Sequence, residues 1–320
     1  MSGTAAPVRV VFAGTPDVAL PGLEAVLADP RVELVGVLSN PARPRGRTGT
    51  PVDPPVAARA RELGLPVLQP ERPADAVDAL AALGADVGAV VAYGAILPRS
   101  VLSVPRAGWV NLHLSLLPRW RGAAPVQHAV RAGDAVTGVT VFRLDAGMDT
   151  GPVLRRVEVP LPPEADAGDL LTRLAGVGAP VLVEGAVAAA AGEPGTPQPE
   201  AGATTAPRLG PADAAVDWTA DASTVARSIR AVTPRPGAVT RLRGAGLKLA
   251  GATVAAADVP AGTRPGTVVA TEGDAVVVAC GAGAVRIARL QPEGRRWAAA
   301  ADVVRGRGLA VGDVLVTDPA

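Results

Sequence analysis

The sequence predicts a chain of the α/β class, in which a Rossmann-like domain built on a parallel sheet precedes a small C-terminal β-barrel of the OB-like type. Strand and helix patterns alternate through residues 8–93, which is typical of a parallel sheet covered by helices. A segment rich in Pro, Gly and Thr interrupts this alternation at residues 193–210. Short β patterns separated by Gly-rich turns follow, and they indicate an antiparallel barrel.

The first strand is expected at Val8–Gly14, where "VRVVFAG" is apolar and rich in valine. A helix should follow directly, with Thr15 as its N-cap and Pro16 in its first turn. The later elements of this domain again alternate between strand and helix, and they are expected at residues 32–40, 55–64, 65–70, 73–84 and 85–93.

The length of 320 residues allows two domains. We predict the first over residues 1–192, a linker over 193–210 and the barrel over 211–320. Hydrophobic residues make up 48% of the chain but aromatic residues only 2%, so Ala, Val and Leu must fill the cores. With two histidines and one cysteine, the chain cannot form a Cys/His zinc site, and we expect no metal.

The first strand is not followed by a nucleotide-binding fingerprint. The sequence after it is "AGTPDVALPG" rather than G-x-G-x-x-G, and the chain contains no G-x-x-x-x-G-K-[ST]. The backbone cradle that binds a pyrophosphate at a helix N-terminus is therefore not predicted. This argues against a nicotinamide-dependent dehydrogenase.

The charge is nearly balanced overall but is unequally distributed. Residues 1–200 contain 17 arginines and 20 acidic residues, a net charge of −3, whereas residues 201–320 contain 14 basic and 10 acidic residues, a net charge of +4. The basic C-terminal part permits a polyanionic partner without requiring one.

The only cysteine, Cys280, lies in an apolar strand pattern, where we expect a core residue of a cytoplasmic protein. We expect no signal peptide at the N-terminus. The most apolar stretch, residues 176–192, contains Glu184 and several glycines, and is expected to be a buried helix rather than a membrane span.

Three polar residues are predicted on one face of a strand. The segment "WVNLHLS" alternates as a β-strand does, so Asn111, His113 and Ser115 point to the same side. They could satisfy buried backbone groups, but their concentration in an apolar region favours a functional site. About thirty residues later, "DAGMDTG" predicts a tight turn, in which turn chemistry alone makes Asp145 and Asp149 equal candidates.

Together these motifs resemble the folate-dependent formyltransferases. The resemblance is carried by the Asn-x-His strand, by the loop "SLLPRWRGAAPVQ" and by "TGVTVFRLDAGMDTGPVL". It extends to "VVFAGTPDVALPGLEAVL", "VVAYGAILP", "NPARPRGR", "VDWTADASTVARSIRAVTPRPGA" and "LQPEGRRW", and so covers nearly the whole chain.

The resemblance implies that Asn111, His113 and Asp149 are the catalytic triad. It also implies a folate-binding stretch, which is Ser115, Leu116, Leu117 and Pro118. The implied formyl donor is 10-formyltetrahydrofolate, and the implied acceptor is the α-amino group of initiator methionyl-tRNA. We accordingly expect a monomeric enzyme that binds tRNA and needs no metal.

The loop after the second strand carries Arg43, Arg45 and Arg47 at alternate positions. Such a loop is commonly a solvated charged turn. Since the implied acceptor is tRNA, we predict that these arginines contact it, because a guanidinium binds phosphate through two N–H groups and stacks on unpaired bases. The loop departs from the family pattern at Ala42, where Asp is usual, and Leu114 stands where Gly is common between the His and the Ser.

Two other functions are compatible with parts of the sequence. A formyltransferase acting on a sugar-nucleotide amine would share the triad and the folate site. A non-catalytic RNA-binding protein would keep the scaffold alone. The complete triad argues against the second, and the Arg43–Arg47 loop favours tRNA over a sugar.

Overall fold

The computed structural model describes residues 6–44 and 49–317. Its contacts divide the chain into two compact units. Unit 1 comprises Met1–Gly122, Thr137–Val159 and Leu171–Thr205, and unit 2 comprises Ala123–Val136, Pro160–Leu170 and Ala206–Ala320. Residues 193–205, within the segment predicted as a linker, group with unit 1 in this division.

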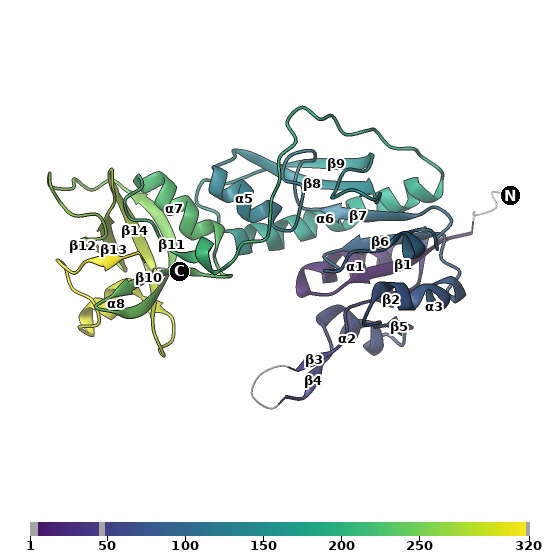
Figure 1. Cartoon of the computed structure of the whole chain (residues 1–320), viewed down its shortest axis with the longest axis horizontal. Coiled ribbons are helices and arrows are strands. Elements are labelled where there is room, and N and C mark those ends of the chain that lie inside the picture. The colour runs from purple at the N-terminus through teal and green to yellow at the C-terminus, as the bar shows by residue number, and fades with distance from the viewer. Residues whose placement is uncertain (1–5, 45–48, 318–320) are drawn as a thin grey trace. The chain divides into compact units, whose positions relative to one another are not determined.

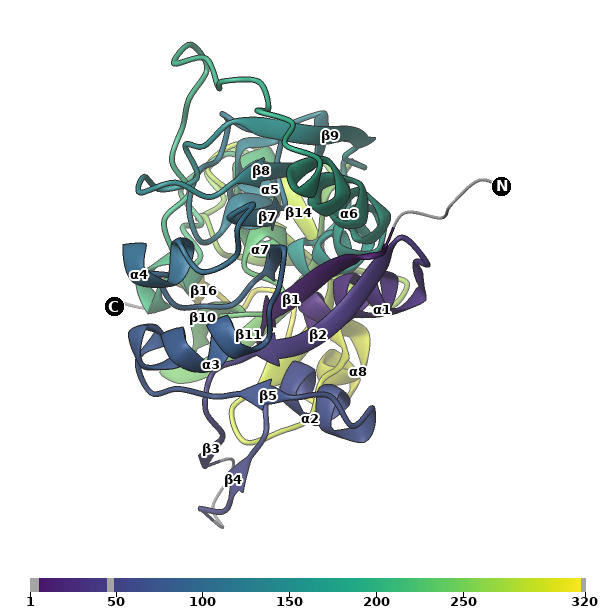
Figure 2. The ribbon, with the colours of Figure 1, turned by 90° about the vertical axis from the view of Figure 1, so that its right-hand side faces the viewer.

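A seven-stranded sheet forms the centre of unit 1, in the spatial order β5-β2-β1-β6-β7-β8-β9 (Figures 1 and 2). The strands from β5 to β7 pair in parallel, and β8 runs antiparallel to β7. The strand bounds are β1 Val8–Gly14, β2 Val32–Leu38, β5 Val67–Leu68, β6 Val87–Val91, β7 Trp109–His113, β8 Val136–Arg143 and β9 Val153–Pro160. The α/β prediction is therefore confirmed.

Helices cover both faces of this sheet. The helix bounds are η1 Asp17–Ala19, α1 Leu20–Ala28, α2 Pro55–Glu62, η2 Pro73–Ala76, α3 Val77–Ala82, α4 Arg99–Leu102 and α6 Ala167–Ala190. Figure 2 shows α3 and α4 on one side of the sheet and α1 and α6 on the other. Successive side chains of β1 point to opposite faces, and on one face Val11 and Ala13 pack in one core cluster with Leu80 of α3 and Val101 of α4.

Helix α6 is long and apolar enough to cross a membrane by length and composition, and half of its most apolar window is buried inside the protein. Its glycines permit close packing on the sheet. A Cβ atom at Gly178 would lie 2.8 Å from the side chain of Leu112 in β7, and one at Gly185 would crowd Val141 in β8. The predicted buried helix is thus present, and it supports the strand that carries Asn111 and His113.

The predicted N-cap at Thr15 is wrong. The chain after β1 first forms the short 3-10 helix η1, whose N-cap is Pro16 and has no side-chain hydrogen bond. The Thr15 hydroxyl instead donates to the carbonyl oxygen of Tyr93 at 2.7 Å. The same oxygen accepts the amide hydrogen of Asn40 at 3.3 Å, so its hydrogen bonds go to the loops after β6 and β2 and not to the first turn of the helix.

Unit 2 contains an antiparallel sheet in the order β12-β13-β14-β11-β10-β16, with β15 paired to β14. Its strands are β10 Ala238–Leu242, β11 Ala245–Ala255, β12 Val268–Glu272, β13 Ala275–Ala279, β14 Ala284–Pro292, β15 Ala298–Ala299 and β16 Leu315–Val316. The first and last strands of this sheet, β12 and β16, are joined by backbone hydrogen bonds at their ends. The Val268 amide donates to the Asp313 carbonyl, and the Leu315 amide donates to the Gly266 carbonyl, both at 2.8 Å. These bonds close the predicted small antiparallel barrel.

The helices of unit 2 pack against this sheet and against one another. They are α5 Pro125–Ala132, η3 Pro211–Ala214, α7 Ala222–Ala231 and α8 Ala300–Arg305. An ion pair of 2.8 Å joins Arg131 of α5 to Asp213 of η3. Cys280 is buried in the barrel core, as predicted, and this burial raises the pKa of its thiol to about 11. The thiol is therefore neutral at physiological pH and unsuited to act as a nucleophile.

Candidate active site

Strand β7 carries two of the predicted catalytic residues. His113 ends the strand, and Asn111 lies two positions earlier on the same face. Antiparallel pairing with β8 fixes both, because Asn111 lies opposite Phe142 and His113 opposite Thr140. The Asn111 side chain is half-buried, and its amide bonds to none of the described residues. Its two N–H groups are thus available to a substrate.

The imidazole of His113 is 7% exposed and lies between two fixed groups. Its Nε2 atom is 2.8 Å from the backbone carbonyl oxygen of Trp120. Since a carbonyl oxygen only accepts hydrogen bonds, Nε2 carries the hydrogen and donates it. On the other side of the ring, Nδ1 lies 3.7 Å from Oδ2 of Asp149. Nδ1 is therefore the ring nitrogen that faces the carboxylate of Asp149.

The structure distinguishes the two aspartates of the "DAGMDTG" turn. Asp149 is half-buried, and besides facing His113 it accepts the amide hydrogen of Gly122 at 2.7 Å. Asp145 is exposed, and its carboxylate accepts hydrogen bonds from the Gly147 amide and the Thr150 hydroxyl. The structure therefore brings Asp149, and not Asp145, to the histidine.

Two residues next to the imidazole have an unusual backbone conformation. Asp149 has a φ of 55° and Trp120 a φ of 65°, both in the left-handed region. This conformation costs a residue other than glycine roughly 1 kcal/mol or more, and it persists where the surroundings enforce it. The backbone on both sides of His113 is therefore held in a form that it would not adopt by itself.

The predicted folate-binding stretch follows β7 directly. The hydroxyl of Ser115 donates to the Arg119 carbonyl at 2.6 Å, and the Leu117 amide donates to the Thr140 hydroxyl at 3.1 Å. Ser115 and Leu117 are almost completely buried, whereas Leu116 and Pro118 are half-buried. Only the latter two of these four residues present surface in this structure.

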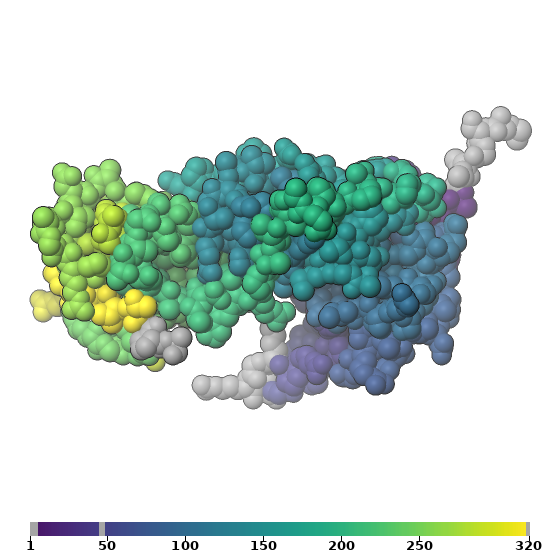
Figure 3. Space-filling model, turned by 45° about the horizontal axis from the view of Figure 1, so that its top comes forward, coloured from purple at the N-terminus to yellow at the C-terminus, as the bar shows by residue number. Residues whose placement is uncertain are grey.

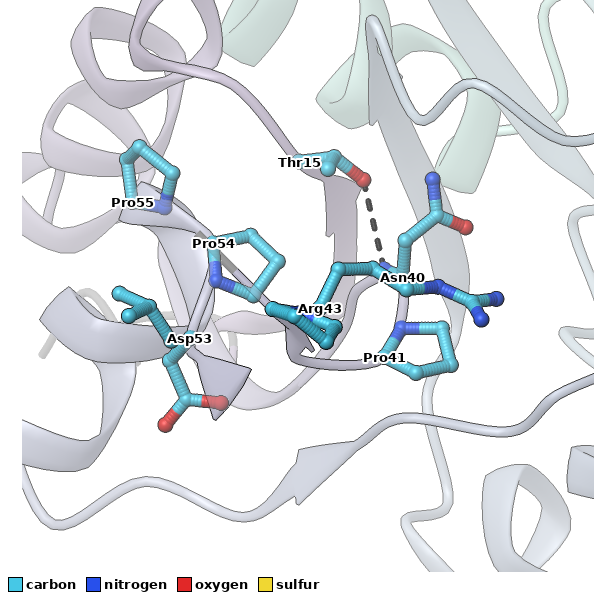
Figure 4. A pocket seen from close by; sticks show the side chains of 9 residues that line it. Thr15, Asn40, Pro41, Arg43, Asp53, Pro54 and Pro55 are labelled. Carbon is cyan, nitrogen blue, oxygen red and sulfur yellow. Dashed lines mark hydrogen bonds between the residues drawn. The ribbon is translucent and has the colours of Figure 1, made fainter. Parts of the chain in front are cut away.

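A cavity of about 420 Å³ opens at the carboxyl ends of β1 and β2 (Figure 4). Thr15, Asn40 and Asp53 line it, together with Arg43 of the short strand β3 (Arg43–Pro44), which pairs with β4 (Pro51–Val52). The triad does not line this cavity. The cavity nevertheless lies at the same end of the sheet as His113, namely at the carboxyl ends of the parallel strands. Strand β6 is the only strand between β1, which ends at the cavity, and β7, which ends at His113.

The three predicted tRNA-contacting arginines can be followed only in part. Arg43 is exposed and makes an ion pair of 3.1 Å with Glu71. Arg45 and Arg47 lie outside the described residues. Within residues 6–44 and 49–317, no cluster of three or more His, Cys, Asp or Glu side chains could hold a metal ion.

Residues 194–205 lie within the segment predicted as a linker, and the sequence does not indicate that they contact the site. These residues run over the surface of unit 1, in green on teal in Figure 3, and they bond to the loops on both sides of His113. Gln198 and Thr204 supply these side-chain bonds. The composition of residues 194–205 does not indicate this contact, because Pro, Gly and Thr are also typical of flexible segments.

Comparison with known proteins places both parts of the chain in one family. A family model described as "Formyl transferase" matches residues 8–185, and one described as "Formyl transferase, C-terminal domain" matches residues 208–308. The chain is 47% identical over 314 residues to a methionyl-tRNA formyltransferase of Aromatoleum aromaticum, covering 97% of this chain and 98% of the relative. It is 46% identical over 316 residues to the protein of that name from Frankia alni, covering 96% and 94%.

Solved structures share the fold at lower identity. HypX from Aquifex aeolicus, in complex with tetrahydrofolic acid, matches with a TM-score of 0.66 and 20% identity, covering 96% of this chain and 48% of HypX, so the chain spans about half of that protein. The sugar 3N-formyl transferase WlaRD matches with a TM-score of 0.66 and 14% identity, covering 91% of this chain and 100% of the other.

Proposed function

The chain belongs to the formyl transferase family, and we propose that it transfers the formyl group of 10-formyltetrahydrofolate to the α-amino group of methionine on initiator methionyl-tRNA. The product is N-formylmethionyl-tRNA for translation initiation. The observation that carries this proposal is the identity of 46–47% to methionyl-tRNA formyltransferases over nearly the whole length of both proteins. The catalytic domain is proposed at residues 1–192 and the tRNA-binding domain at 211–320 of a cytoplasmic monomer.

Formyl transfer is an acyl transfer to an amine. The neutral α-amino nitrogen attacks the formyl carbon, and a tetrahedral intermediate with a negatively charged oxygen forms. The bond between the formyl carbon and N10 of the folate then breaks. The electron pair stays on N10, which takes up one proton, while the attacking nitrogen loses one. The enzyme must therefore stabilise the oxyanion and move a proton from one nitrogen towards the other.

The geometry suits these tasks. The free amide of Asn111 can donate to the oxyanion, and one such donor typically contributes about 3–4 kcal/mol to transition-state stabilisation. His113 supplies positive charge on the same strand face when Nδ1 is protonated, and Asp149 at 3.7 Å stabilises that charge. The carboxylate of Asp149 can also accept the proton that the amine releases, directly or through water.

The placement of Arg43 supports tRNA as the acceptor. Arg43 lines the cavity at the sheet edge that also carries His113, so an acceptor end at the triad can extend past it. The net charge of residues 201–320 is +4, which suits a second contact with the polyanion. Residues 115–118 are proposed to support the folate site, with Leu116 and Pro118 presenting its surface.

A sugar-nucleotide amine is the second candidate acceptor, because sugar formyltransferases such as WlaRD share the fold. The test is to supply the purified protein with 10-formyltetrahydrofolate and one acceptor at a time: initiator methionyl-tRNA, elongator methionyl-tRNA or a nucleotide-linked amino sugar. Formylation of the initiator tRNA in clear preference to the other two is expected. Formylation of the sugar alone would replace the proposal, and tRNA binding without any formylation would indicate a non-catalytic RNA-binding protein.

A further inference from the structure

We propose that residues 194–205, here called the strap, hold the catalytic groups of unit 1 in their working geometry, and that Gln198 and Thr204 are its positioning residues. The inference rests on the formyl transfer proposed above and adds residues outside the triad and the folate stretch. Neither side chain is required to touch a substrate.

The strap is fixed to unit 1 at both of its ends. Near its start, Thr196 and Val153 of β9 exchange two backbone hydrogen bonds of 2.8 Å, as neighbouring strands do. Near its end, the Arg121 amide donates to the Thr204 carbonyl at 2.8 Å, and the Thr204 amide donates to that of Pro118 at 3.3 Å. Its middle is thereby held against the loops that flank His113.

The amide group of Gln198 connects these two loops. Its Nε2 donates one hydrogen to the Asp149 carbonyl and the other to the Gly151 carbonyl, both at 2.8 Å. Its Oε1 accepts from Arg121, from Nη2 at 2.9 Å and from Nε at 3.1 Å. All hydrogen-bonding positions of the amide are therefore used, and the side chain ties the turn of Asp149 to the loop that follows Trp120.

Thr204 acts on the opposite side of the imidazole. Its hydroxyl oxygen accepts the amide hydrogen of Trp120 at 2.9 Å. The carbonyl of Trp120 in turn accepts Nε2–H of His113. The hydroxyl thus fixes the peptide backbone of the residue that orients the ring.

The two strap residues bond to the two left-handed residues of the site. Asp149 and Trp120, with φ of 55° and 65°, are the residues whose groups face Nδ1 and Nε2 of His113. A backbone held in this region needs support from its surroundings, and the strap gives each of them a side-chain hydrogen bond. Without these bonds both residues can relax, and the carboxylate and carbonyl would move away from the ring.

Thr204→Val and Thr204→Ser form a matched pair of variants. Valine has the shape of threonine but cannot accept the Trp120 amide hydrogen, whereas serine keeps the hydroxyl. We expect Thr204→Val to lower kcat by about 10- to 100-fold, within the range that a misplaced catalytic group loses, while KM for both substrates changes by less than about threefold. Thr204→Ser should retain most of the wild-type kcat. Thr205→Val, at the exposed neighbouring position, is the control and should resemble the wild type.

Gln198→Ala tests whether the strap acts through Asp149. Alone it should lower kcat about 10- to 100-fold, but in an Asp149→Asn background it should lower kcat by less than about threefold. The effects of two substitutions on the rate are not additive when both disrupt one catalytic unit, whereas a general loss of folding would lower the rate equally in both backgrounds. Thermal unfolding of each variant provides the measure of folding.

Hydrogen exchange of the Trp120 and Gly122 amides provides a readout without activity. Both should exchange faster in Thr204→Val and Gln198→Ala than in the wild type and in Thr205→Val. Unchanged exchange together with unchanged kcat would overturn the inference, as would full additivity with Asp149→Asn. A wild-type protein that forms no formyl-methionine would refute the proposed function instead, and the exchange rates would still test whether the strap holds these loops.

Discussion

Replacing Asp149 by asparagine tests the pairing at the centre of the site. Asparagine has the same size and retains an oxygen that can accept the Gly122 amide hydrogen, so the change removes mainly the negative charge. That charge lies 3.7 Å from Nδ1 of His113, and the two side chains are only 16% and 7% exposed. At this separation an effective dielectric constant of about 20 gives an attraction to the imidazolium of about 4 kcal/mol.

The loss in rate follows from how much of this attraction acts in the transition state. If between half and all of it is lost, the rate of formyl transfer falls about 30- to 1,000-fold, since about 1.4 kcal/mol corresponds to a factor of ten. A single-turnover assay with saturating enzyme measures this step, because it separates chemistry from product release. Donor and tRNA affinities should stay within about threefold of the wild type.

Asp145→Asn is the matched control in the same turn. Its exposed carboxylate accepts hydrogen bonds from Gly147 and Thr150, which an asparagine oxygen can also accept. This variant should retain at least about a third of the wild-type rate. If Asp149→Asn kept a wild-type rate and Asp145→Asn lost it, the assignment of the charge partner of His113 would have to be reversed.

Two further predictions concern the acceptor and the donor loop. Replacing Arg43, Arg45 and Arg47 by Ala should raise KM for tRNA about 10-fold. It should also make KM depend less steeply on salt concentration, because fewer counterions are released on binding. An unchanged dependence of KM on salt concentration would exclude phosphate contacts by this loop. Leu117→Asp should unfold unit 1 rather than merely weaken donor binding, because the side chain is 1% exposed and a buried unpaired carboxylate is very costly. A folded variant with only a weakened donor affinity would instead place Leu117 in the folate site.

The sequence predicted the fold well where the pattern was local. The valine-rich runs predicted at Val8–Gly14 and Val32–Asn40 correspond to β1 and to β2, which ends at Leu38, because predominantly apolar segments of that length suit strands buried on both faces. The N-cap at Thr15 failed for a physical reason. A threonine before a helix has the chemistry of a cap, but the bond to the Tyr93 carbonyl involves a residue 78 positions away, which no local pattern contains.

The site illustrates the same limit. Alternation along a strand was sufficient to place Asn111 and His113 on one face. Turn chemistry could not separate Asp145 from Asp149, since only the folded chain brings one of them to His113. The bonds of Gln198 were equally hidden, because they join residues 47 to 77 positions apart within a segment whose composition suggested flexibility.

The most direct measurement is a formylation assay of the wild-type protein and His113→Ala, with initiator and elongator methionyl-tRNA as acceptors and 10-formyltetrahydrofolate as donor. The wild-type protein should form formyl-methionine on the initiator tRNA in strong preference to the elongator. His113→Ala should lower this rate at least about 100-fold while binding the tRNA with nearly unchanged affinity. A wild-type protein without this activity would contradict the proposed function, and a variant that keeps more than about a tenth of the rate would contradict the role of His113.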